Sequence, residues 1–192
     1  EKGCNINLDD TTSLDRLNTI GLPKRISFRL NPGFGKGTFS QITTAGRKAK
    51  FGIPAEKITD AYQKAINLGI KNFGMQCMVG SGNLDEEHFF DVISAIIKKT
   101  KSISSKLGIK FDFISMGGGF GIPYKDNEIP INFDRLFSKL SDIFYKTYKN
   151  RMDSPAFWIE PGKSIIGDTG IILSKVTGVK KSYKNFIGIN AG

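Results

Sequence analysis

The stretch KFDFISMGGGFG, which runs from Lys110 to Gly121, contains the pattern that decides the fold. Its first half predicts an apolar strand over Lys110–Met116, and three consecutive glycines follow at once. Glycine leaves backbone N–H groups uncovered and lets a bulky anion come close, so the run suits a phosphate. It also suits a flexible connection between a strand and a helix. Taken alone, the run leaves both interpretations open.

Strand and helix patterns alternate outward from this stretch in both directions. The other predicted barrel strands are Cys4–Leu8, Arg25–Leu30, Asn72–Val79 and Ala156–Ile159. The predicted helices are a short one from Asp10 through Leu17, then Ala55–Leu68, Asp85–Leu107 and Phe133–Tyr148. Such alternation implies parallel βαβ units whose right-handed crossovers place the helices on one side of the sheet. The pattern therefore predicts an α/β fold, a partial (β/α)8 TIM-type barrel with about five of the eight strands that closure requires.

The pattern changes after Glu160. The stretch Ile165–Tyr183 carries β-branched residues and glycines without a helical period, and Asn185–Asn190 predicts one more strand. We therefore expect residues 1–163 to form the partial barrel and residues 164–192 to begin a C-terminal β domain. Because barrel strands are too few and the sequence stops directly after a strand, we expect a fragment of a longer enzyme.

Composition excludes several classes of protein. Among 192 residues, 39% are apolar and 24% charged, as in soluble globular proteins. No apolar run approaches the roughly 20 residues that span a bilayer, and residues 1–10 do not resemble a signal peptide, so a cytoplasmic protein is expected. The net charge is +10, but the lysines are scattered, which favours a solvated surface over a nucleic-acid site. The charge still favours an anionic ligand.

The cysteines and the histidine carry little functional signal. Cys4 and Cys77 lie far apart in apolar, strand-like stretches, so both are expected to be reduced core thiols rather than zinc ligands or a disulfide. The only histidine, His88, falls inside a predicted helix and is expected at the surface.

Two more polar motifs follow predicted strands. In the loop Val79–Asn83, the Ser81 hydroxyl can donate to a phosphate, or it can cap the next helix. In the turn Trp158–Lys163, Glu160 can point into a barrel mouth with Lys163 near an anion, or the two can form a surface ion pair. All three motifs lie at carboxyl ends of strands, where barrels of this type place their chemistry. A glycine loop, a serine, a lysine and a carboxylate that converge there match the needs of pyridoxal 5'-phosphate (PLP).

The motifs also resemble a known family in their order along the chain. The segments are RISFRLNPG (Arg25–Gly33), KFGIP (Lys50–Pro54), GSGN (Gly80–Asn83), GGGFGIPY (Gly117–Tyr124), EPGKSIIG (Glu160–Gly167) and GINAG (Gly188–Gly192). They resemble the diaminopimelate decarboxylases, which belong to the alanine-racemase-like, fold-type III PLP enzymes. The resemblance covers nearly the whole chain.

The resemblance implies cofactor-binding roles for particular residues. The residues that it implies are Arg29, Met78, Ser81, Gly117, Gly118, Gly119, Glu160, Gly162 and Lys163. The glycine amides and Ser81 hold the phosphate in this family, and the carboxylate pairs with the protonated pyridine nitrogen. Lys163 stands where the family usually has arginine, and Arg29 lies beneath the cofactor. A carboxylate at the nitrogen makes the ring a strong electron sink, which favours a decarboxylase over a racemase.

This sequence also departs from the family. Met78 and Gln76 replace two histidines, Asn190 replaces an aspartate, and the motif with the lysine that holds the cofactor covalently has no counterpart. The catalytic residues are therefore not assigned, and the fragment itself is expected to be inactive. For the parent enzyme the resemblance implies decarboxylation of meso-diaminopimelate to lysine by a cytoplasmic homodimer. A related decarboxylase of basic amino acids or carboxylated polyamines, and a catalytically silent homologue, remain alternatives.

Overall fold

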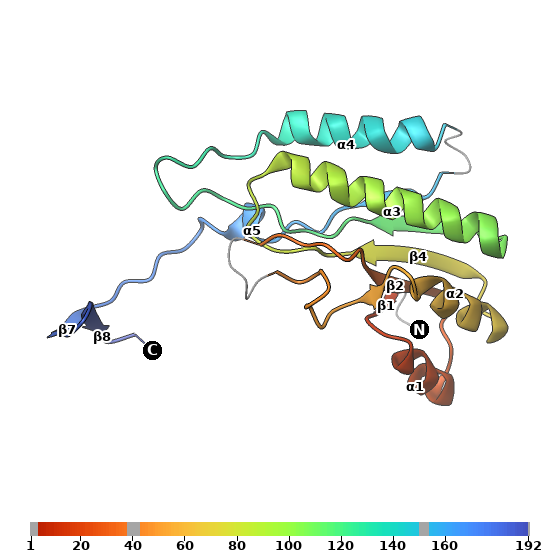
Figure 1. The fold of residues 1–192 in the computed structure, drawn as a ribbon, viewed down its shortest axis with the longest axis horizontal. Coiled ribbons are helices and arrows are strands. Elements are labelled where there is room, and N and C mark those ends of the chain that lie inside the picture. The colour runs from red at the N-terminus through yellow and green to blue at the C-terminus, as the bar shows by residue number, and fades with distance from the viewer. Residues whose placement is uncertain (1–3, 38–42, 150–153, 192) are drawn as a thin grey trace.

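The sheet is parallel, as the sequence predicts. A computed structural model describes residues 4–37, 43–149 and 154–191, so Gly192 of the GINAG motif lies outside the described residues. Its six parallel strands follow the order β1-β2-β4-β5-β6, and β3 pairs with β2 (Figure 1). They are β1 (Ile6–Leu8), β2 (Arg25–Asn31), β3 (Ile53–Pro54), β4 (Asn72–Cys77), β5 (Phe111–Ser115) and β6 (Ala156–Trp158). The strand order follows the chain order, as in a barrel wall.

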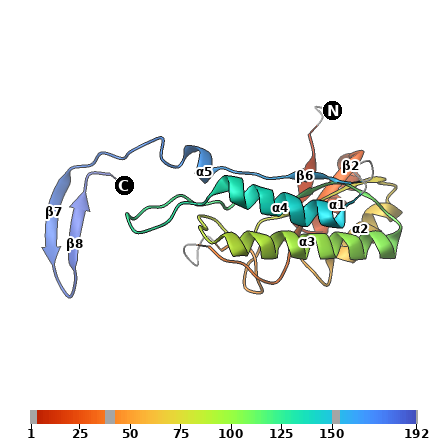
Figure 2. The ribbon, with the colours of Figure 1, turned by 90° about the horizontal axis from the view of Figure 1, so that it is seen from above.

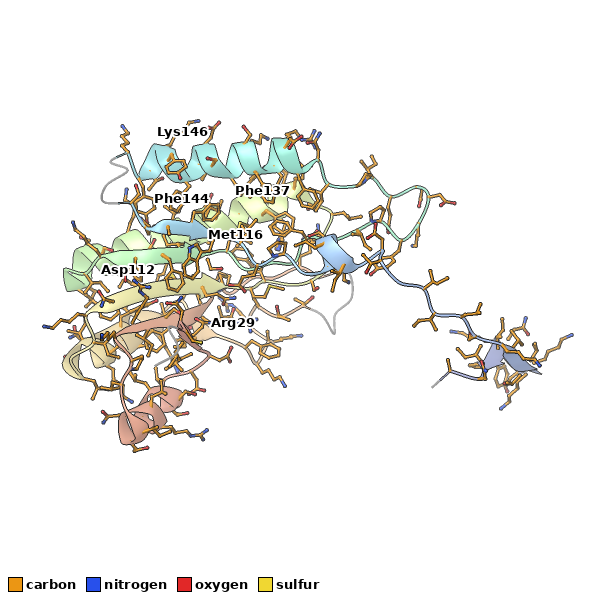
Figure 3. All side chains as sticks on the ribbon, turned by 180° about the vertical axis from the view of Figure 1, so that it is seen from behind. Arg29, Asp112, Met116, Phe137, Phe144 and Lys146 are labelled. Carbon is orange, nitrogen blue, oxygen red and sulfur yellow. The ribbon has the colours of Figure 1, made fainter. Side chains whose placement is uncertain are left out.

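Four helices accompany this sheet. They are α1 (Thr12–Ile20), α2 (Ile58–Asn67), α3 (Glu86–Leu107) and α4 (Phe133–Thr147). Helices α3 and α4 lie side by side along one face of the sheet (Figures 1 and 2). From α4, the buried Phe144 points toward the sheet and stacks on Phe157 with 4.9 Å between ring centroids, whereas the exposed Lys146 points away (Figure 3). The amphipathic period of the sequence therefore sets which face of α4 is buried.

The helix-facing side of the sheet is an aromatic and aliphatic core. Tyr62 of α2 is fully buried, and its ring centroid lies 5.0 Å from Phe28, 5.9 Å from Phe73 and 5.2 Å from Phe111. Its hydroxyl donates a 2.6 Å hydrogen bond to the carbonyl oxygen of Gly74. One side chain thus connects α2 with three neighbouring strands of the sheet.

The opposite side of the sheet corresponds to the interior of the barrel. Side chains alternate between the two sides of a strand, and the register aligns Gln76 with Ser115 and Ser115 with Trp158. The rings of Phe113 and Trp158 stack here at 4.0 Å, and a Cβ at Gly74 would collide with the Phe113 ring. This side therefore carries polar and aromatic residues rather than an aliphatic layer.

The helix ends decide one alternative that the sequence leaves open. Asp85 is the N-cap of α3, because its carboxylate accepts a 3.2 Å hydrogen bond from the Glu87 amide. Gly108 ends the same helix in the left-handed conformation, with φ of 67°. Asp85 thus supplies the cap that Ser81 could have supplied.

The chain leaves the barrel region after β6. A single helical turn, α5 (Lys163–Ile166), follows, then an antiparallel hairpin of β7 (Val176–Lys181) and β8 (Asn185–Ile189). The hairpin is exposed and stands away from the parallel sheet (Figures 1 and 2). The expectation that Ile165 begins a stretch without helix is wrong, because the amides of Ile165 and Ile166 both donate to the Gly162 carbonyl oxygen. The domain boundary at residue 163 stays a prediction.

Two single-residue expectations are also wrong. Cys4 is exposed rather than in the core, because it precedes the first paired residue of β1, whereas Cys77 is buried as predicted. His88 is only 7% exposed, because its ring lies against the rings of Phe34 and Phe89. Among the described residues, no helix combines the length and the apolar character that crossing a membrane requires.

Candidate functional site

Three loops meet at the carboxyl ends of β4, β5 and β6. The glycine run that follows β5 packs backbone to backbone against the loops on both sides. A Cβ at Gly118 would collide with the carbonyl oxygen of Glu160, and a Cβ at Gly119 would collide with that of Gly80. Gly117 and Gly119 also adopt φ angles of 73° and 97°, which side chains disfavour. Residues with side chains would separate the three loops.

Backbone hydrogen bonds fix these loops to one another. The Asn83 amide donates to the Gly119 carbonyl oxygen at 2.9 Å, and the Gly121 amide donates back to Asn83 at 2.8 Å. On the other side, the Glu160 amide donates to the Gly117 carbonyl oxygen at 2.8 Å. The loop that contains Ser81 and the turn that contains Glu160 therefore flank the glycine run, as the sequence predicts.

The glycine run keeps two backbone donors available. No residue that the structure describes accepts a hydrogen bond from the amide of Gly118 or of Gly119. Gly118 is buried, and buried amides in proteins are almost always paired. Adjacent unpaired amides in a tight glycine turn form a site for an anion such as a phosphate. The residues present therefore fit the phosphate group of PLP.

The Glu160 carboxylate receives a hydrogen bond on each of its two oxygens. The Ser115 hydroxyl donates to Oε1 at 2.6 Å, and the Gln76 side-chain nitrogen donates to Oε2 at 3.1 Å. Lys163 does not supply these bonds, because its Nζ lies over the Tyr124 ring at 5.5 Å from the centroid. The carboxylate is thus directed toward the barrel interior rather than toward a surface ion pair.

Arg29 and Met78 lie at the same end of the sheet. The Arg29 guanidinium donates to the carbonyl oxygens of Thr44 at 3.2 Å and Met78 at 3.3 Å, and it lies 4.9 Å from the centroid of the Phe51 ring. A Cβ at Gly119 would lie 3.8 Å from the Met78 methyl carbon. Arg29 therefore holds the backbone at the end of β4, and the Met78 side chain borders the glycine run.

A hollow opens beside the Ser81 loop. Its volume is about 350 Å³, and Gly82, Asn83, Ile122 and Tyr124 contribute to its lining. Ser81 itself is half-buried, and Gly162 lies at the beginning of α5. The roles of these two residues toward a cofactor stay predictions.

Sequence reasoning missed the hydrogen-bond network behind Glu160. It named Gln76 only as a departure from a family pattern, and it assigned no role to Ser115, Asn7 or Ser27. The sequence did contain a signal, because Ser27, Gln76 and Ser115 are polar residues inside otherwise apolar predicted strands. The structure shows that all three are buried. Buried polar side chains need partners, so such positions point toward one another across a sheet.

Comparisons with known proteins agree with this geometry. The family model described as "Pyridoxal-dependent decarboxylase, pyridoxal binding domain" matches residues 1–167. The chain is 36% identical over 196 residues to diaminopimelate decarboxylase of Methanothermobacter thermautotrophicus, with 100% of this chain and 45% of that protein covered. It is 37% identical over 188 residues to the enzyme of the same name from Archaeoglobus fulgidus, with 94% of this chain and 44% of that protein covered.

Solved structures show the same likeness. The crystal structure of diaminopimelate decarboxylase from M. jannaschii in complex with L-lysine superposes with a TM-score of 0.76 and 28% identity. That match covers 98% of this chain and 45% of the other. The chain therefore spans a little under half the length of the relatives that it matches.

Proposed function

Because the chain belongs to the pyridoxal-dependent decarboxylases, we propose that it binds pyridoxal 5'-phosphate at the joined ends of β4, β5 and β6. One observation carries this proposal: two glycine amides that donate to no described residue lie beside a turn whose carboxylate, Glu160, is held by hydrogen bonds. The amides suit the phosphate, and the carboxylate suits the ring nitrogen.

The phosphate end of the site is built mainly from backbone. The amides of Gly118 and Gly119 bind phosphate oxygens, and the Ser81 hydroxyl adds one donor from the neighbouring loop. Lys163 contributes a positive charge from the beginning of α5, although it lacks the two-pronged donor geometry of arginine. Arg29 stabilises the backbone below the cofactor through its bond to the Met78 carbonyl oxygen.

Glu160 determines the chemistry at the other end of the site. When bound, the cofactor supplies a ring that takes up the electron pair left by a departing carboxyl group. Glu160 would hold a proton on the ring nitrogen of the bound cofactor, because its carboxylate would accept a hydrogen bond from that N–H. Ser115 and Gln76 hold the carboxylate in place for this contact. This arrangement favours decarboxylation.

We propose diaminopimelate as the substrate of the whole protein, with lysine as the product. Relatives that are 36% and 37% identical to the chain carry the name diaminopimelate decarboxylase, and one similar structure holds L-lysine. The proposal includes a homodimer that works in the cytoplasm, as the family resemblance implies. Release of CO2 from meso-diaminopimelate, compared with arginine, ornithine and carboxylated polyamines, tests the substrate.

A catalytically silent homologue is the second candidate, and Met78 favours it. Its thioether borders the glycine run where the family usually places a histidine, and it cannot exchange a proton. This candidate predicts that the protein binds the cofactor but releases no CO2 from any amino acid in the panel.

Equilibrium dialysis against PLP tests the binding site itself. Gly118→Ala should abolish binding, because its methyl group displaces the turn at Glu160. Gly170→Ala is the matched control, because a Cβ at Gly170 meets no atom within 4 Å. Ser81→Ala provides a milder variant that preserves the backbone and should weaken binding. A wild-type protein that binds no PLP contradicts the proposal, as does equal binding by all three variants.

A further inference from the structure

A hydrogen-bond network runs across the barrel interior and ends on Glu160. The Ser27 hydroxyl donates to Asn7 Oδ1 at 2.8 Å, and Asn7 Nδ2 donates to Gln76 Oε1 at 3.4 Å. Gln76 then donates to Glu160 at 3.1 Å, and Ser115 donates to Glu160 from the next strand at 2.6 Å. We call these five residues the interior network. They come from β1, β2, β4, β5 and the turn after β6.

The donors of the interior network point in one direction. Because Asn7 donates to the Gln76 carbonyl oxygen, the Gln76 nitrogen is left facing Glu160. Because Ser27 donates to the Asn7 carbonyl oxygen, the Asn7 nitrogen is left facing Gln76. Each amide is therefore oriented by the residue before it, and the final donor is directed at the carboxylate. A network of this kind fixes rotamers that an isolated glutamine would leave open.

Ser115 connects the two ends of the site. Its hydroxyl donates to Glu160, and the same oxygen accepts a 3.1 Å hydrogen bond from the Gly117 amide. Gly117 begins the glycine run, and the next two amides of this run donate to none of the described residues. One buried hydroxyl, 1% exposed at the residue level, thus sets the distance between the carboxylate and the anion-binding turn. A rigid ligand with a phosphate at one end and a ring nitrogen at the other requires such a fixed distance.

We propose that Gln76 and Ser115 are positioning residues, which hold the Glu160 carboxylate against the ring nitrogen of the cofactor. This inference rests on the proposed function. Neither residue touches the cofactor in this account, and each acts through Glu160. Both donors are neutral groups, a side-chain amide and a hydroxyl.

A pair of ligands separates this role from general damage to the site. PLP carries the phosphate and the ring nitrogen, whereas its deaza analogue has C–H in place of that nitrogen. Wild-type protein should bind PLP more tightly than the analogue, because only PLP can pair with Glu160. Gln76→Leu and Ser115→Ala should each lower PLP affinity about tenfold, the effect of one lost hydrogen bond to a charged group. Affinity for the analogue should stay unchanged in Gln76→Leu. In Ser115→Ala, which also loses the acceptor of the Gly117 amide, affinity for the analogue should fall less than affinity for PLP.

Control variants make the comparison specific. Thr100→Val removes a buried hydroxyl of α3 that bonds to Tyr148 and to backbone away from the site, so it should leave both affinities unchanged. Gln76→Glu keeps the size of the side chain but faces Glu160 with a second carboxylate. If Gln76→Leu does not fold, as circular dichroism will show, Gln76→Glu tests the same contact.

Each result of these titrations decides the proposal. A preference for PLP that disappears in the Gln76 and Ser115 variants supports it. If the variants lower the affinities for PLP and for the analogue equally, or lower neither, the positioning role is overturned. The proposed cofactor-binding site is not contradicted by that result. A wild-type protein that binds neither ligand removes the proposed function and this inference together. As a second readout, the nitrogen-15 chemical shift of the bound ring should change in both variants but not in Thr100→Val.

Discussion

Ser115 of β5 donates a 2.6 Å hydrogen bond to the carboxylate of Glu160, which follows β6 and lies 45 residues later in the chain. Strands β5 and β6 are paired, with Ser115 opposite Trp158, so the contact between Ser115 and Glu160 forms only when the sheet is assembled. The same hydroxyl also accepts the Gly117 amide. This relationship links the glycine run with the carboxylate, so the two parts of the proposed site share one side chain.

Glu160→Gln should leave the fold intact and lower the turnover of the whole protein. The amide keeps the size of the side chain but removes the negative charge that, in the proposed site, would hold a proton on the ring nitrogen. We expect a loss of about a hundredfold in turnover number, typical of a lost acid–base contact, with PLP still bound. Steady-state CO2 release and PLP titration measure the two effects. Unchanged turnover would remove Glu160 from the mechanism.

Tyr62→Phe should destabilise the barrel without changing the site. The substitution leaves the Gly74 carbonyl oxygen without its 2.6 Å partner in the core, while the ring contacts with Phe28 and Phe111 persist. The cost should be on the order of 1 kcal/mol in the free energy of unfolding, measured by urea denaturation. Tyr183→Phe is the control, because Tyr183 is fully exposed in the hairpin turn. Equal stability of wild type and Tyr62→Phe would contradict the account of the core.

The two cysteines should differ in reactivity. Cys4 is exposed, whereas burial raises the pKa of Cys77 to about 12, so its thiolate is scarce at neutral pH. A thiol-specific chromogenic reagent should label Cys4 in the folded protein and both cysteines after denaturation. Cys4→Ser should remove the native reaction. Rapid native labelling of Cys4→Ser would show that Cys77 is accessible.

His88 should make stability depend on pH. Burial lowers the pKa of His88 below its ordinary value of 6.5, so the unfolded state binds the proton more readily than the folded state. The stabilising contribution is therefore complete above pH 6.5 and decreases as the pH falls from there toward the folded-state pKa. Urea midpoints between pH 8 and pH 5 should decrease less in His88→Gln than in the wild type. Identical slopes in the two proteins would contradict the burial of a neutral imidazole.

The main helices and strands can be predicted from local sequence patterns, because the spacing of apolar residues in a segment reflects which of its faces is buried. The strands over Arg25–Asn31 and Asn72–Cys77 and the long α3 agree with the sequence within a few residues. The single turn α5 was missed because four residues after a glycine carry no helical period. His88 was placed at the surface because nothing in its own helix shows that Phe34, from a distant loop, covers it.

The candidate site also has one part that the sequence predicts and one part that it does not. The convergence of the loops around Ser81, Gly118 and Glu160 follows from the rule that parallel strands end at a common edge. The bonds from Gln76 and Ser115 to Glu160 depend on which residues stand opposite each other across strands, and the sequence does not fix that register. The interior network is therefore visible only in the structure and could not be predicted from the sequence.

The nitrogen-15 chemical shift of PLP labelled at the ring nitrogen, bound to the wild type and to Glu160→Gln, tests the central claim most directly. We expect the shift of a protonated ring nitrogen in the wild type and a change toward the unprotonated value in the variant. The same shift in both proteins would show that Glu160 does not face the nitrogen, and the site described at the ends of β4, β5 and β6 would then not be the cofactor site.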